Sequence, residues 1–172
     1  TELPSLFVLR SRTAGASAAG CAWSPGPAST RGTRTAATGA PTAQQVVTKL
    51  RAAGLPIGSI KVYNTSNDGT RLLGRPGQYT GRASFRDRRI KDGGGGFAVS
   101  SGGSIEIFAS TADARRRFEL FRAIFESGPP SAFAEYDYLV GNAILRLSHV
   151  LTPAQARKYV VALRRLVETR AE

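Results

Sequence analysis

The feature that most constrains the fold of this chain is an alternating segment over residues 134–149, with Gly141-Asn142 at its centre. A two-residue turn at Gly-Asn places the aromatic and leucine side chains of both arms on one face of a hairpin. The same register sets Asp137 opposite Arg146 on the other face, where we expect solvent. A shift by one residue would expose the apolar set and separate the charges. The sequence therefore predicts an antiparallel β-hairpin with one buried face.

Three segments have the polar start and apolar stripe of amphipathic helices. The predicted starts are Thr42 with Gln45, Ser110 or Thr111, and Thr152 with Gln155. The predicted buried stripes are Val46, Val47, Leu50 and Ala53; Ala114, Phe118, Phe121 and Phe125; and Ala156, Val160, Leu163 and Val167. Each stripe needs a sheet or another helix to cover it.

Shorter alternating segments predict the remaining strands at 59–63, 80–87, 97–100 and 104–109. A three-residue loop of Ser-Gly-Gly between the last two predicts a second hairpin. Strands joined by short turns form mostly antiparallel sheets. The sequence thus predicts an α+β fold, with a mostly antiparallel sheet of about five to six strands and three helices packed on one face.

The first forty-one residues differ in composition from the rest, because residues 22–41 consist almost wholly of small and turn-forming residues. Such a segment buries too little apolar surface to fold. We therefore expect residues 1–41 to be a leader and flexible tether, and residues 42–172 to be a single globular α+β domain. Ala18, Ala19 and Gly20 precede Cys21, and this pattern resembles the lipobox of bacterial lipoproteins. The resemblance implies a signal peptide, export and a lipid anchor on Cys21.

Four stretches extend this resemblance into the domain: LLGRPGQYTGRASFRD, FASTADARRRFELF, EYDYLVGNAILRLS and LTPAQARKYVVAL. They resemble uncharacterised secreted lipoproteins of high-GC Gram-positive bacteria, and the similarity covers roughly residues 45–168. The resemblance implies a place on the extracellular face of the cell membrane. It implies no activity and no catalytic residue.

The chain is basic, with a formal net charge of +12, which favours anionic partners. Arg82, Arg86 and Arg88 alternate along one predicted strand, so they form a possible anion-binding face. A solvated outer face of the sheet is the alternative explanation of the same pattern.

One cysteine and one histidine leave little for metal or triad chemistry. The sequence predicts no metal site, no cofactor and no catalytic residue; Glu135 and Asp137 share a strand face, but Arg146 is expected to keep Asp137 ionised. The leading hypothesis is an envelope-anchored, non-enzymatic binding module for a protein or an anionic envelope polymer. The alternatives are a cytoplasmic nucleic-acid-binding domain and, third, a small hydrolase.

Overall fold

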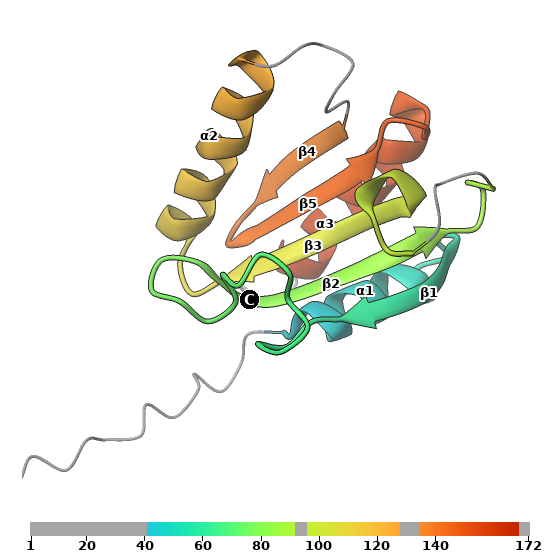
Figure 1. Cartoon of the computed structure of the whole chain (residues 1–172). Helices are drawn as coiled ribbons and strands as arrows, with labels where there is room; N and C mark the ends of the chain where they lie inside the picture. Colours follow the sequence, from blue (N-terminus) through green and yellow to red (C-terminus); the bar gives the residue numbers. More distant parts are fainter. Residues whose placement is uncertain (1–40, 92–95, 128–134, 169–172) are drawn as a thin grey trace, which may run out of the picture. The chain divides into compact units, whose positions relative to one another are not determined.

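The computed structural model describes residues 41–91, 96–127 and 135–168. Its helices are α1 (Ala43–Ala52), α2 (Thr111–Ser127) and α3 (Pro153–Glu168), and a 3₁₀ turn spans Val99–Ser101. Its strands are β1 (Ile57–Val62), β2 (Tyr79–Asp87), β3 (Gly102–Phe108), β4 (Glu135–Val140) and β5 (Ala143–Ser148). The five strands form one sheet in the order β1-β2-β3-β5-β4, and every neighbouring pair is antiparallel (Figure 1). The predicted α+β fold is confirmed.

The predicted helix starts are formed as the sequence indicates. Thr42 and Gln45 exchange side-chain to backbone hydrogen bonds in a complete capping box. Thr152 and Gln155 do the same at the start of α3. Ser110 accepts a hydrogen bond from the backbone N–H of Asp113 at the start of α2. These bonds satisfy donors that a helix N-terminus leaves free.

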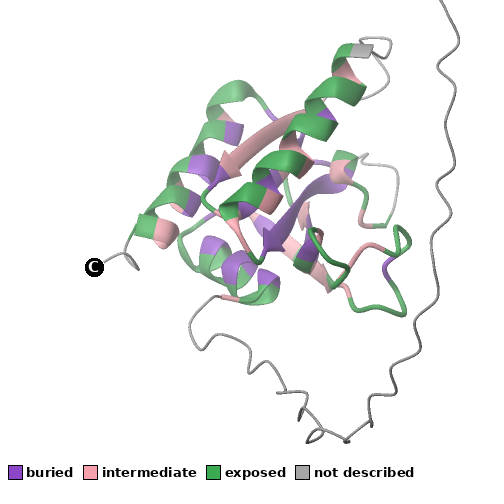
Figure 2. Cartoon of the chain, turned by 90° about the vertical axis from the view of Figure 1, so that its left-hand side faces the viewer, coloured by how far each residue is buried: buried purple, intermediate pink, exposed green. Residues whose placement is uncertain are grey.

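The helices cover both faces of the sheet, which corrects the expectation that all three pack on one face. Helices α1 and α3 lie on one face of the sheet (Figure 1). Most residues of their predicted stripes pack against alternate strand residues, including Phe85 and Leu145, but Ala53, which was predicted to be buried, is exposed. Helix α2 packs its phenylalanines on the opposite face, against Phe108 and Ile144. Adjacent strand residues point to opposite faces, so Ile144 gives α2 an apolar contact that Leu145 cannot. Figure 2 shows the buried strands between helices whose outward turns are exposed.

The hairpin of β4 and β5 has the predicted register, and Asp137 lies opposite Arg146. Gly141 has a φ of 57°, as the first position of a type II′ turn requires. The expectation that Asp137 and Arg146 face solvent is wrong. Their side chains are only 10% and 16% exposed, because α2 lies over this face of the sheet.

The predicted hairpin over residues 97–109 does not form. Val99–Ser101 is a 3₁₀ turn, and Gly102 and Gly103 belong to β3, which pairs with β2 and β5. A Cβ at Gly102 would lie 2.3 Å from the carbonyl oxygen of Phe85. The glycine pair therefore permits close approach of a neighbouring backbone, whereas the sequence pattern resembles a turn.

Candidate functional site

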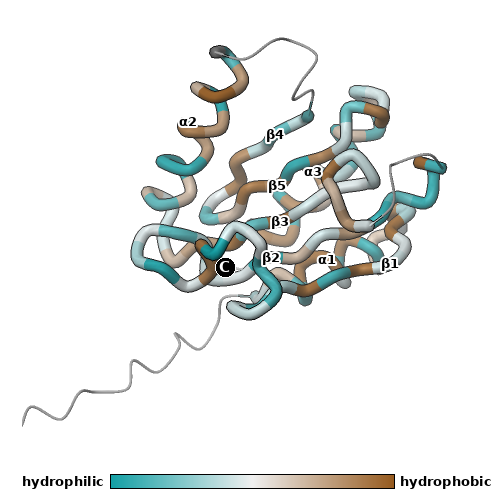
Figure 3. The backbone as a smooth tube through the Cα atoms, in the orientation of Figure 1, coloured by the Kyte–Doolittle hydropathy of each residue, from teal (hydrophilic) through white to brown (hydrophobic). Residues whose placement is uncertain are grey.

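The loop between β1 and β2, residues 63–78, holds a polar pocket. The loop is mostly hydrophilic (Figure 3) and packs on the same side of the sheet as α2, because Asp68 contacts Tyr79 and Arg82 there. Loops on a rigid sheet are common positions for binding sites. How this loop is held in place decides whether its side chains can bind anything.

Asp68 organises the loop from its centre, and it is 3% exposed. Its carboxylate accepts hydrogen bonds from Thr70 Oγ1, Tyr79 Oη, the backbone N–H groups of Leu72 and Leu73, and Nη1 of Arg82. Burial alone would raise the pKa of Asp68, but the hydrogen bonds from Tyr79, Thr70 and the backbone outweigh it and hold the pKa well below its ordinary value. Asp68 is therefore an ionised structural anchor.

Asn64 and Asn67 hold the first half of the loop. The side-chain oxygen of Asn64 accepts from the backbone N–H groups of Ser66 and Asn67, at 3.0 Å each. The side-chain oxygen of Asn67 accepts from the N–H of Asn64 at 2.8 Å. Such local bonds fix a turn without helix or sheet. The loop is thus pre-ordered before any ligand arrives.

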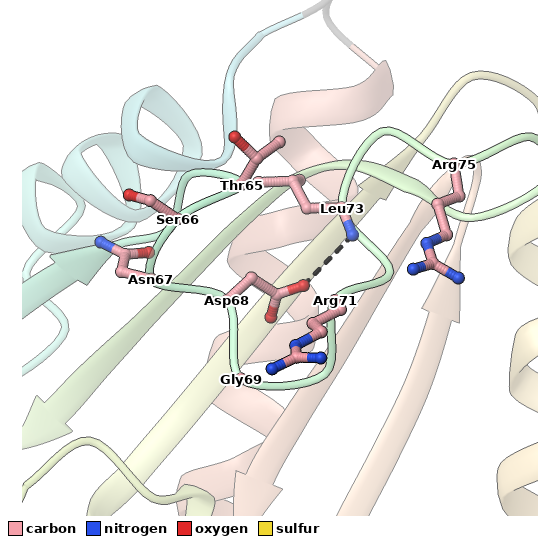
Figure 4. Close-up of a pocket in the computed structure, with 8 residues that line it drawn as sticks. All are labelled: Thr65, Ser66, Asn67, Asp68, Gly69, Arg71, Leu73 and Arg75. Atoms are coloured by element: carbon pink, nitrogen blue, oxygen red, sulfur yellow. Dashed lines mark hydrogen bonds between the residues drawn. The ribbon is translucent and has the colours of Figure 1, made fainter.

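The pocket in this loop has a volume of about 500 Å³. Its lining residues are Thr65, Ser66, Asn67, Asp68, Gly69, Arg71, Leu73 and Arg75 (Figure 4). Hydroxyl and amide side chains come from the first half of the loop, and the two arginines come from the second half. The hydroxyl of Ser66 and the amide nitrogen of Asn67 already donate to Asn64 and Val62 within the loop. The donors left for a ligand are therefore the hydroxyl of Thr65 and the two guanidinium groups, and guanidinium donors match a phosphate or carboxylate.

Arg71 and Arg75 are the exposed cations of this loop pocket. In the part of the chain that the structure describes, neither forms an ion pair. Arg71 has a φ of 56° and is the sole non-glycine residue with positive φ among the described residues. That conformation costs about 1–2 kcal/mol. Glycine would adopt this φ at lower cost. A strained arginine at an exposed position therefore indicates a role for its side chain.

A second polar feature lies under α2, and we name it the ionic cluster. It consists of Arg82, Glu106, Arg117, Glu135, Asp137 and Arg146. Arg82 lies opposite Glu106 across β2 and β3, and Arg146 lies opposite Asp137 across β5 and β4. Glu135 accepts a hydrogen bond from Nε of Arg146 at 3.0 Å and forms an ion pair with Nη2 of the same guanidinium group at 2.8 Å.

Two carboxyl groups of the ionic cluster have raised pKa values. Burial raises the pKa of Glu106 more than the neighbouring arginines lower it. Burial also raises the pKa of Asp137 to about 6, with Arg146 opposing and Glu135 adding to the rise. A carboxyl group with that pKa can exchange protons near neutral pH. Among the described residues there is no group of potential ligands that could hold a metal ion.

The sequence-predicted site residues are only partly brought together. Arg82 is drawn into an ion pair with Asp68 at 3.0 Å and lies over the ring of Tyr63. Arg86 is half-buried, and Arg88 is exposed just beyond the end of β2. The three arginines therefore do not form a row of free cations. Cys21, like the whole predicted leader before residue 41, lies outside the described residues.

The sequence alone does not reveal the loop pocket, because its residues are ordinary turn formers. The available signal is the dense Asn, Thr, Ser and Asp content of residues 64–70, followed closely by Arg71 and Arg75.

In the described part of the chain, no helix is both long enough and apolar enough to cross a membrane. Comparisons with models of protein families, with curated proteins and with solved structures found no match to this chain.

Proposed function

We propose that this chain is a non-enzymatic binding module that takes a phosphate- or carboxylate-bearing ligand into the loop pocket. The observation that carries the proposal is the pair Arg71 and Arg75, two exposed guanidinium groups without an ion-pair partner among the described residues, on a loop fixed by Asp68. Pre-ordering lowers the entropy cost of binding. An anionic envelope polymer supplies such groups repeatedly and is the ligand class that we favour.

We further propose that the module acts on the outer side of the cell membrane, attached through a lipid on Cys21. The support is the run of small residues before Cys21 and the tether-like composition after it. Membrane fractions of the native host, analysed by mass spectrometry, should contain the chain with acylated Cys21 as its first residue. Intact unmodified chain confined to the cytosolic fraction would contradict this part of the proposal.

Binding should be tested by NMR titration of the 172-residue chain with inorganic phosphate, a glycerol-phosphate polymer and polygalacturonate. We expect shifts in residues 65–75, and affinity should rise from the single ion to the polymers because several anionic groups can bind in turn. The variant Arg71→Ala/Arg75→Ala should weaken binding at least tenfold. The matched control Lys49→Ala/Arg164→Ala removes the same charge from exposed positions of α1 and α3, on the other face of the sheet. Equal losses in both variants, or no shifts at all, would contradict the proposal.

Nucleic acid and hydrolysis are weaker proposals. Arg82 is already paired with Asp68, which reduces the charge available for phosphate contacts along β2. Asp137 has a pKa suited to acid–base chemistry, but α2 covers it and it does not line the loop pocket. Binding of duplex DNA to the parent chain at low salt, lost in Arg86→Ala/Arg88→Ala, would favour the nucleic-acid alternative.

A further inference from the structure

The outer surface of α3 carries a groove that the proposed function does not use. It lies between the end of α1 and the outward face of α3, and its volume is about 810 Å³. Its apolar lining includes Leu55, Val161 and Leu166. Val161 is 41% exposed, whereas Val160 and Leu163 of the same helix are buried and Leu166 and Val167 are partly buried.

Every charged residue that lines this groove is basic. They are Arg157, Lys158 and Arg165. Arg157, Lys158 and Val161 recur at helical spacing along the exposed side of α3. Basic residues beside exposed apolar surface favour contact with an anionic bilayer. A partner that binds in this groove therefore needs negative charge, and apolar groups on that partner would add favourable contact.

The residues that line the groove also argue against a protein partner. Stable protein interfaces concentrate their binding energy in aromatic or methionine anchors at the centre of the contact. Among the described residues, the lining of this groove contains alanine, glycine, leucine, proline and valine with the three basic residues, and neither an aromatic residue nor methionine. An anionic lipid surface needs no such anchor, because each basic residue near it contributes about 1 kcal/mol to binding.

We infer that the α1/α3 face of the domain rests on an anionic lipid bilayer through Arg157, Lys158 and Val161. This face lies on the other side of the sheet from α2 and the loop pocket. Membrane contact and ligand binding can therefore occur together, with the loop pocket directed away from the lipid. A few cations and one exposed valine give weak, reversible binding, which becomes effective for a tethered domain.

The test is sedimentation of the lipid-free, 172-residue chain with vesicles, so it does not depend on acylation of Cys21 or on the ligand of the loop pocket. One vesicle set is phosphatidylcholine alone, and the other contains phosphatidylglycerol as well. We expect binding to the anionic vesicles only, and weaker binding as salt rises. Each basic residue near an anionic surface raises binding roughly fivefold. Arg157→Glu/Lys158→Glu should therefore weaken binding at least about 20-fold.

The matched control is Arg115→Glu/Arg116→Glu, which changes the net charge equally on the outer side of α2 and should bind nearly as the parent chain does. Arg157→Gln/Lys158→Gln provides a milder second variant, and thermal melts check that all three variants fold. Absence of binding to anionic vesicles overturns the inference, as do equal losses in both charge-reversed variants. Binding of an acidic amphipathic peptide at α3, with vesicles inert, would also overturn it in favour of a protein partner.

Discussion

The carboxylate of Glu106 lies 3.6 Å from Nε of Arg117, beyond hydrogen-bond distance although both side chains are largely buried. Among the described residues, neither Oε2 of Glu106 nor Nε of Arg117 has a hydrogen-bond partner. Attraction without a hydrogen bond recovers little of the cost of burying two charges. The guanidinium groups of Arg117 and Arg146 both lie over the ring of Phe121, at 4.3 and 4.4 Å from its centroid, and these cation–π contacts also attach α2 to the sheet.

The first prediction concerns the pH dependence of stability, which we assign to Asp137. Its folded pKa of about 6 lies above the ordinary value of 3.8, so the folded protein holds this proton more tightly than the unfolded chain. Above about pH 6, Asp137 is ionised in the folded chain, and its buried charge lowers the free energy of unfolding. As pH falls from 6 toward 4, the folded chain takes up the proton first and this destabilisation disappears. The full effect is about 3 kcal/mol. The free energy of unfolding should rise between pH 7 and pH 5.

Asp137→Asn tests that assignment, because an amide does not ionise. We expect the variant to be at least as stable as the parent chain at pH 7 and to show a flatter dependence between pH 7 and pH 5 in urea titrations. Glu126→Gln is the control, since Glu126 is exposed on α2, and it should keep the parent slope. A parent chain that loses stability from pH 7 to pH 5 would show that Asp137 is not the controlling group.

The second prediction concerns Asp68. Asp68→Asn keeps the shape of the side chain but removes the charge that Arg82 and four other donors require. Breaking one partner of a buried ion pair costs about 3–5 kcal/mol, and urea denaturation should show a loss of that size. The stability difference between Asp68→Asn and the parent chain should shrink below about pH 4. The pKa of Asp68 is depressed in the folded chain, so the stabilising effect of its charge declines as pH falls from the ordinary pKa of 3.8 through the lower folded pKa. A loss under about 1 kcal/mol would mean that the loop is held otherwise.

The third prediction concerns the α2 core. Phe121 is buried and stacks on Phe125 with ring centroids 6.3 Å apart. Phe121→Ala should lower the free energy of unfolding by about 3–5 kcal/mol, from lost burial and lost contact with two guanidinium groups. Leu120 is 49% exposed on the same helix, so Leu120→Ala should cost under about 0.5 kcal/mol. Similar losses for both would mean that α2 packs by another face.

The sequence predicts most of the fold, because its strongest signals are local. The capping boxes at Thr42 and Thr152 and the turn at Gly141 each act over a few residues, and all are present in the structure. The side of the sheet that α2 covers could not be predicted, because both faces of β5 carry apolar residues. That choice depends on contacts far apart in sequence, such as Ile144 with α2.

The candidate site was harder to predict for the same reason. The loop pocket depends on two contacts of Asp68. Its carboxylate accepts a hydrogen bond from Tyr79, eleven positions away, and forms an ion pair with Arg82. Sequence alternation correctly set Arg82 on one face of β2 but could not show that a carboxylate from the preceding loop would pair with it. Local composition indicated a turn, and only the tertiary fold makes that turn a pocket.

The fourth prediction compares two glycines. At Gly141 a Cβ would meet only Val167, at 3.4 Å, but the φ of 57° is strained for other residues. Gly141→Ala should therefore cost about 1 kcal/mol. At Gly102 a Cβ would lie 2.3 Å from a backbone oxygen of β2, which no side-chain rotation relieves. Gly102→Ala should cost several times more in thermal melts. Equal costs would mean that β2 and β3 do not approach so closely.

The fifth prediction separates stability from binding at Arg71. Both Arg71→Gly and Arg71→Ala remove the guanidinium group, so both should weaken binding of a phosphate or carboxylate to the loop pocket by a similar factor. Only glycine relieves the positive φ of 56° at this position, and that conformation costs a non-glycine residue about 1–2 kcal/mol. Arg71→Gly should therefore be more stable than Arg71→Ala by about 1 kcal/mol in urea denaturation. If the glycine variant were the less stable of the two, the backbone at this position would not be strained, and the inference that the strain is kept for the sake of the side chain would fail.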